Sequence, residues 1–182
     1  MLSLLPVMLV SVCTISDPAT PTSTVTPVVP TAAYLALDAP DRHVRAPDSR
    51  VRGLIAYGFH RSPTFADLLQ QLNQSDVIVY IESLMTLPRD TMGRITVVPR
   101  VGTARYLRMQ IRSDLSRREA IALIAHEMRH ALEIAAEPDA RDGDGLIKLY
   151  ERIGQSSGGD HAYDTTEAQN VGRRVLKEMA GA

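Results

Sequence analysis

The sequence predicts a single-domain α+β protein, and three stretches indicate this fold class. Residues 77–81 are almost all β-branched, as expected for a strand that is covered on both faces. Residues 104–111 alternate polar with apolar side chains, which is typical of a strand with one open face. Residues 116–137 are mainly Ala, Leu, Ile, Met, Arg and Glu, which favour a helix. Together they predict a small mixed sheet that packs against a long helix.

The first 15 residues predict an export signal. Residues 2–12 form an apolar run of the length found in the hydrophobic part of signal peptides, which is too short to span a bilayer as a helix. Cys13 follows this run, and it is either the lipidated cysteine of a lipoprotein signal or an ordinary residue of a signal peptide. We therefore expect an exported protein that is secreted, periplasmic or anchored to the cell envelope by a lipid at Cys13.

Residues 16–50 predict a spacer followed by an irregular segment. Prolines recur among Thr, Ser, Val and Ala up to residue 31, and such a stretch cannot bury enough apolar surface to order itself. Two further prolines, Pro40 and Pro47, stand among mixed charges. We expect the folded domain to comprise residues 51–182.

Within that domain, periodicity and capping signals predict the remaining elements. Ser62 and Pro63 mark the start of a helix at residues 64–73, in which apolar residues recur at helical spacing. Residues 93–99 predict a further strand. A short helix at residues 146–153 and a last helix at residues 165–179 follow the long helix.

The long helix carries the candidate site. Ser116 and Glu119 have the spacing of a capping box at its start, and a proline marks its end. Because successive residues are rotated by about 100° on a helix, one broad arc is apolar and faces a core. The other side carries His126, Glu127 and His130.

The spacing of these three residues suits metal chemistry. His126 and His130 lie one turn apart on the same face, so two ring nitrogens can bind one metal ion. Glu127 is rotated away from the metal axis, so it can reach a water on the metal without being a ligand, as a general base must. The alternative is that all three are ordinary residues of an amphipathic helix, with Glu127 paired to a nearby arginine.

The sequence HEMRH, from His126 to His130, resembles the His-Glu-x-x-His motif of the zincin metallopeptidases. The resemblance implies a minimal zincin-like domain in which His126 and His130 bind Zn²⁺ and Glu127 activates the water that hydrolyses a peptide bond. It also implies that the strand before the helix, residues 104–111, lies at the edge of the sheet and pairs with a peptide substrate.

A catalytic zinc site needs a third protein ligand. The metzincin branch uses a third histidine on the same segment, which this chain lacks. The chain is more similar to the thermolysin-like gluzincins, in which a glutamate on a downstream helix binds zinc, and this resemblance implies Glu167. His161 and Asp164 are the alternatives, and Glu167 is otherwise an ordinary first-turn acid. Glu133 or Glu137 could orient a ligand from the long helix itself.

Composition excludes several other functions. The net charge is −1 and no run of Lys or Arg occurs, so we expect no nucleic-acid partner. A single cysteine, Cys13, excludes a thiolate metal cage. The alternative to a peptidase is a catalytically inactive zinc-binding interaction module on a zincin scaffold. Glu127 argues against that alternative, because metal binding alone does not need it.

Overall fold

The computed structural model describes residues 9–10, 42–87, 91–98, 104–156 and 162–181 of the chain. The predicted spacer up to residue 41 and nearly all of the predicted export signal, including Cys13, lie outside these residues and stay predictions. None of the described helices is long and apolar enough to cross a membrane.

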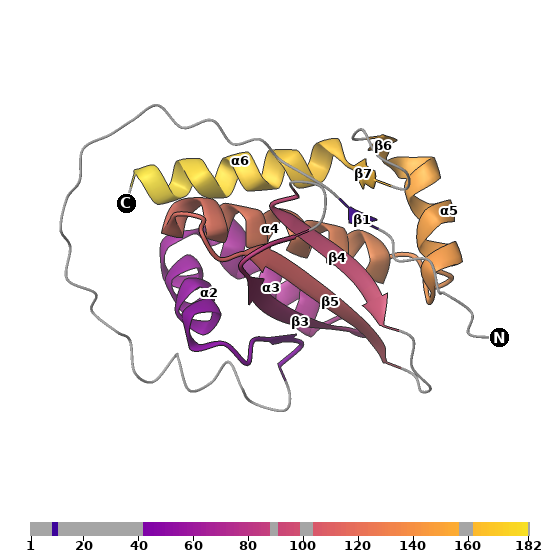
Figure 1. Cartoon of the computed structure of the whole chain (residues 1–182), viewed down its shortest axis with the longest axis horizontal. Helices are drawn as coiled ribbons and strands as arrows, with labels where there is room; N and C mark the ends of the chain where they lie inside the picture. The colour runs from indigo at the N-terminus through magenta and orange to yellow at the C-terminus, as the bar shows by residue number, and fades with distance from the viewer. Residues whose placement is uncertain (1–8, 11–41, 88–90, 99–103, 157–161, 182) are drawn as a thin grey trace.

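Four strands form the main sheet in the order β2-β3-β5-β4 (Figure 1). The strands are β2 (Val44–Arg45), β3 (Val77–Leu84), β4 (Gly93–Val98) and β5 (Arg105–Arg112). β3 pairs in parallel with both β2 and β5, whereas β4 pairs antiparallel with β5. The predicted α+β class with a small mixed sheet is therefore confirmed.

A second, smaller sheet pairs the first described residues with two strands from the C-terminal part of the chain. It has the order β1-β7-β6, with β1 parallel and β6 antiparallel to β7. Its strands are β1 (Leu9–Val10), β6 (Gln155–Ser156) and β7 (Ala162–Asp164). β7 leads directly into the last helix.

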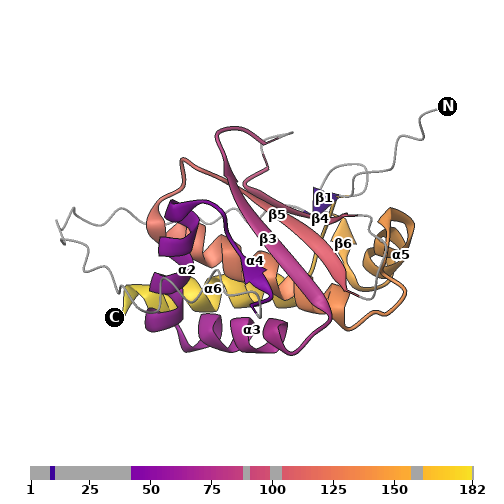
Figure 2. The same cartoon turned by 90° about the horizontal axis from the view of Figure 1, so that it is seen from below.

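The described residues form five helices, and α4 is the central one. The helices are α2 (Ser49–Arg61), α3 (Pro63–Asn73), α4 (Arg117–Ala135), α5 (Gly143–Ile153) and α6 (Thr166–Ala180). α4 packs against the main sheet, against α2 and α3, and along α6. Figure 2 shows that α2, α3, α4 and α6 all lie on the same side of that sheet. The α4 helix is therefore enclosed by other elements, and this enclosure positions the candidate site.

Side-chain caps explain where the helices begin. At α4, the Ser116 hydroxyl accepts from the Glu119 N–H, and the Glu119 carboxylate accepts from the Ser116 N–H, which is the predicted capping box. Three other helices begin with a simpler cap, in which one side-chain oxygen accepts from a backbone N–H of the first turn. The capping residues are Ser62 for α3, Asp142 for α5 and Thr165 for α6. The predicted starts of the helices at residues 64, 116 and 165 are thus confirmed to within a residue or two.

The fold begins before residue 51, where we expected the domain to start. Val44 and Ala46 are both buried in the core, and β2 extends the main sheet by one strand. The Asp48 carboxylate then caps α2 by accepting from the Arg50 N–H (2.7 Å). Part of the segment that the sequence predicts to be irregular therefore belongs to the folded unit.

The sequence pattern did not predict α2. Two glycines, Gly53 and Gly58, interrupt its helical signal, because glycine is a poor helix former. Gly58 nevertheless has a packing role: a Cβ at this position would lie 3.0 Å from Ile121 and 3.1 Å from Phe65. The glycine thus allows α2 to approach α3 and α4 closely, and tertiary packing outweighs its low propensity.

The prediction that residues 104–111 form the edge strand is wrong. β5 lies between β3 and β4, and β4 is the last strand of the sheet. The reason is the parallel pairing of β5 with β3 along its whole length, which leaves the antiparallel β4 no position except outside β5. The edge nearest α4 therefore belongs to β4.

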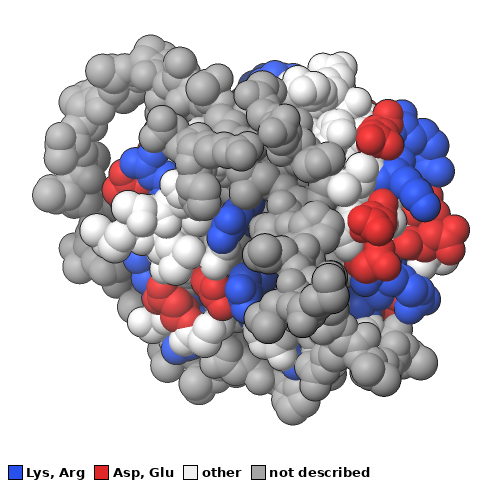
Figure 3. Space-filling view, turned by 45° about the vertical axis from the view of Figure 1, so that its right-hand side comes forward, with Lys and Arg blue, Asp and Glu red and all other residues white. Residues whose placement is uncertain are grey.

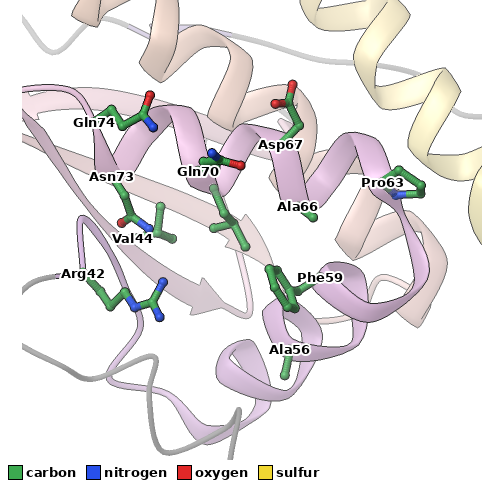
Figure 4. Close-up of a pocket in the computed structure, with 11 residues that line it drawn as sticks. Arg42, Val44, Ala56, Phe59, Pro63, Ala66, Asp67, Gln70, Asn73 and Gln74 are labelled. Carbon is green, nitrogen blue, oxygen red and sulfur yellow. The ribbon is translucent and has the colours of Figure 1, made fainter.

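A groove of about 650 Å³ opens between β2, α2 and α3 (Figure 4). Its walls are mainly apolar, with Phe59 and Leu69 among them, and Arg42 and Asp67 lie at its rim. None of the residues that line it belongs to the predicted metal site. On the face shown in Figure 3, acidic and basic side chains of the described residues are interspersed.

Arg105 joins the end of α4 to the sheet. Its guanidinium donates to the carbonyls of Ile134 (2.6 Å) and Ala135 (2.8 Å) in the last turn of α4 and to that of Glu137 (2.6 Å) just beyond it. It also donates two hydrogen bonds to the Asp76 carboxylate, at 2.9 and 2.6 Å. One side chain from β5 therefore caps the carboxyl end of α4 and is itself fixed by the residue that precedes β3.

Replacing Arg105 by methionine should destabilise the protein by about 2–3 kcal/mol, because it leaves three helix-end carbonyls and Asp76 without their charged donor. The free energy of unfolding in urea measures this. Arg108→Met on the same strand is the control, since Arg108 is exposed and should change stability by less than about 0.5 kcal/mol. Equal losses in the two variants would contradict the role assigned to Arg105.

Asp76 should contribute an acid-sensitive part of the stability. The hydrogen bonds from Arg105 hold its pKa below the usual value. A carboxyl with a depressed pKa stabilises the fold above its unfolded pKa of about 3.9, and this contribution is lost as the pH falls through the lower, folded value. The parent should therefore exceed Asp76→Asn in unfolding free energy more at pH 6 than at pH 2. A difference independent of pH would contradict this.

Candidate metal centre

The three motif residues lie in the interior of the protein. His126 is 1% exposed, and Glu127 and His130 are fully buried. The sequence predicts an apolar arc on one side of α4 only, but α6 covers the other side. α6 packs against His126 at Gly172, where a Cβ would lie 3.5 Å from the Cβ of His126, in ordinary van der Waals contact.

Asp164 completes a cluster with the two histidines. The Nε2 atoms of His126 and His130 lie 3.1 Å apart, and each lies 3.4 Å from Oδ1 of Asp164. Asp164 ends β7 and is 2% exposed. Three potential ligand atoms from two distant segments therefore face one another in a buried position.

These spacings fit a tetrahedral metal ion. Ligands bound at about 2.0–2.1 Å in tetrahedral geometry lie about 3.3 Å from one another, which matches the separations in this cluster. Two imidazoles and one carboxylate would also leave a fourth coordination position open. The buried group of His126, His130 and Asp164 could thus hold a metal ion.

The structure does not bring Glu167 to this cluster, which corrects the prediction that it is the third ligand. Thr165 caps α6, so Asp164 immediately precedes the helix and faces α4, whereas Glu167 lies in the first turn and is exposed. A first-turn acid is favoured by the helix dipole without any metal. Of the two alternatives, Asp164 is in the cluster, and His161 lies outside the described residues.

Two further groups fix the Asp164 carboxylate. The N–H of Thr165 donates to Oδ1 (2.7 Å), and the amide of Gln169 donates to Oδ2 (2.9 Å). Both donors belong to the start of α6. The orientation of Asp164 is therefore set by the same cap that begins this helix.

The other ring nitrogen of His130, Nδ1, belongs to a hydrogen-bond network on the side of the ring away from Asp164. Nδ1 of His130 lies 2.8 Å from the Glu133 carboxylate and 3.2 Å from the hydroxyl of Tyr150. The other oxygen of Glu133 accepts from the Thr165 hydroxyl (2.8 Å). Tyr150 comes from α5 and is fully buried. The predicted orienting residue is thus Glu133, whereas Glu137 pairs with Arg152 at the surface.

Glu127 stands apart from these networks. Neither of its carboxylate oxygens has a hydrogen-bond partner among the described residues. The carboxylate lies against the start of β4, where a Cβ on Gly93 would come within 2.8 Å of Oε1. Burial raises the pKa of Glu127 to about 8. A buried acid without a partner is costly, and such groups are enriched where chemistry occurs.

The charges of the cluster are mutually dependent. Burial and the neighbouring His130 lower the pKa of His126 to about 4. Burial also disfavours a charge on His130, but hydrogen bonds to Asp164 and Glu133 outweigh it and raise its pKa to about 9. The pKa values of Asp164 and Glu133 are lowered, since their contacts with the imidazoles outweigh burial. The two carboxylates therefore stay ionised and attract positive charge.

Comparison with protein-family models, curated proteins and solved structures finds no match for this chain. The resemblance to zincins therefore stays a prediction from the motif residues.

Asp164→Ala should weaken metal binding by at least about 100-fold, because removing a ligand costs more than removing a group that only orients one. Glu167→Ala, three residues away and exposed, should bind metal as the parent does. Chelator competition with Zn²⁺ measures both affinities. Weak binding by Glu167→Ala together with parent-like binding by Asp164→Ala would restore the ligand role to Glu167.

Proposed function

We propose that the protein is a zinc-dependent metallopeptidase whose zinc is held by His126, His130 and Asp164. The observation that carries this proposal is a fully buried Glu127 carboxylate, without a hydrogen-bond partner among the described residues, on the same helix as two of three ligand atoms at tetrahedral spacing. Burying an acid without a partner costs stability. Together the three ligand atoms and the carboxylate would supply a metal centre and a base.

The donor set favours zinc over other common metal ions. Two imidazole nitrogens and one carboxylate oxygen are typical ligands of catalytic zinc, whereas Mg²⁺ and Ca²⁺ prefer oxygen ligands and higher coordination numbers. Histidine ligands usually bind a carboxylate or carbonyl through the ring nitrogen that does not face the metal, and Nδ1 of His130 contacts Glu133 in this way.

The burial of negative charge supports a divalent cation at this position. Glu133 and Asp164 are buried carboxylates whose lowered pKa values keep them ionised. The nearest arginine contact is that of Arg129 with Glu133, at 3.5 Å. Buried charges need a charged partner, and of the two histidines only His130, whose pKa is raised to about 9, is protonated near neutral pH. A bound dication would offset these carboxylates.

Glu127 is the proposed general base. When bound, zinc lowers the pKa of a water and polarises the carbonyl under attack. In its ionised form, which the positive charge of bound zinc would favour, Glu127 would take up the proton of the attacking water. Neither of its oxygens has a competing hydrogen bond among the described residues. Gly93 keeps the space beside the carboxylate free of a side chain.

The proposed substrate is a peptide in extended conformation. β4 is the last strand of the main sheet and starts beside Glu127, so a peptide laid along it would carry its backbone toward the base. An extended segment already lies there, since the backbone of Leu9–Val10 contacts β4 and pairs with β7. We also propose that this activity operates outside the cytoplasm, as the first 15 residues indicate.

The substitution Glu127→Gln tests the base. It keeps the size of the side chain but cannot accept a proton, so hydrolysis of a quenched peptide library should fall by roughly 10²–10⁴-fold while one zinc per chain stays bound. Glu167→Gln, an exposed residue of α6, is the control and should hydrolyse as the parent does. Undiminished hydrolysis by Glu127→Gln would rule out Glu127 as the base.

The second candidate is a zinc-binding interaction module without catalysis. The burial of all four site residues favours it, because a peptide must reach Glu127 to be cleaved. The same experiment separates the two functions. A parent protein that holds zinc tightly but cleaves no member of the library would support the module.

A further inference from the structure

We infer that Glu133 is a positioning residue that fixes two of the three proposed metal ligands at once. This inference rests on the proposed metal centre. Glu133 lies outside the His-Glu-x-x-His motif, one turn beyond His130 on α4, and its side chain is 6% exposed. Each of its two carboxylate oxygens serves a different segment of the site.

The first oxygen orients His130. Oε2 of Glu133 lies 2.8 Å from Nδ1 of the imidazole, which is the ring atom that faces away from Asp164. A proton held on Nδ1 by this carboxylate leaves Nε2 with its lone pair directed at the cluster. The contact also stops rotation of the ring about its χ angles. A carboxylate at this position makes a bound imidazole a stronger ligand.

The second oxygen orients the segment that carries Asp164. Oε1 of Glu133 accepts from the hydroxyl of Thr165 (2.8 Å), and the backbone N–H of Thr165 donates to Oδ1 of Asp164 (2.7 Å). Thr165 also caps α6. Glu133 therefore joins α4 to the start of α6 at the residue next to the third ligand.

Glu133 is itself held from two sides. The Tyr150 hydroxyl donates to Oε2 at 3.4 Å, and the guanidinium of Arg129 lies 3.5 Å from Oε1. Tyr150 also stacks with Tyr163, the residue before Asp164, with ring centroids 6.4 Å apart. The carboxylate thus has little freedom to move, as a residue that sets the geometry of others requires.

The test is metal binding by full-length variants, with Zn²⁺ affinity from chelator competition and the visible spectrum of bound Co²⁺ as readouts. Glu133→Gln should bind zinc about 10–100-fold more weakly and alter the Co²⁺ spectrum, because the charge and the acceptor geometry are lost. Glu137→Gln, one turn further and paired at the surface with Arg152, is the matched control and should resemble the parent.

Thr165 supplies a second, independent variant. Thr165→Val removes the hydroxyl and should weaken zinc binding about tenfold, whereas Thr165→Ser keeps the hydroxyl and should restore parent affinity. The double variant Glu133→Gln/Thr165→Val should lose less than the product of the two single losses, since both remove the same contact. The comparison of Thr165→Val with Thr165→Ser tests the inference even if Glu133→Gln does not fold.

The outcomes separate this inference from the proposed function. Tight binding by the parent with unchanged affinity and Co²⁺ spectrum in Glu133→Gln would overturn the positioning role and leave the metal centre intact. A Thr165→Ser variant as weak as Thr165→Val would also overturn it. A parent that binds neither metal would overturn the metal centre, and the role of Glu133 with it.

Discussion

The burial of ionisable side chains along α4 is the constraint on which the rest of the structure depends. His126, Glu127, His130 and Glu133 are at most 8% exposed, and burying such polar groups is costly unless they meet partners. His126, His130 and Glu133 have partners among the described residues, whereas the Glu127 carboxylate has none there. The partners come from the elements around it: Asp164 and Thr165 from the start of α6, and Tyr150 from α5. The positions of α5 and of the start of α6 therefore depend on the polar side chains of α4.

The remaining elements serve to hold this helix at a fixed position. The sheet supplies one apolar face, Gly58 lets α2 approach, and α6 packs against His126 at Gly172. At its carboxyl end, Arg105 ties three carbonyls to β5 and Asp76. Gly58 thus allows close packing of α2, while Arg105 fixes the position of the carboxyl end of α4 relative to the sheet.

Much of the fold was predictable because its signals are local. The capping box of α4, the Ser62-Pro63 start of α3 and the two β-rich runs are all read within a few residues, and His126, Glu127 and His130 lie within one turn. Asp164 was not distinguishable from Glu167 in this way. The choice between them depends on how α6 is rotated about its axis, and that rotation is set by packing against α4. The edge position of β4 is likewise a property of strand pairing, which no local pattern encodes.

The location of the ligands on two segments has a consequence for the entropy of the chain. An ion bound by His130 and Asp164 would close a loop that contains α5 and the β6–β7 hairpin, much as a disulfide closes the chain between two cysteines. Such a cross-link acts mainly by reducing the number of conformations open to the unfolded loop. α5 buries Leu146 and Leu149 in the core and contributes the buried Tyr150 to the site. The ion would then be a reversible cross-link for this part of the chain, whereas the main sheet, α2 and α3 lie outside the loop that it closes.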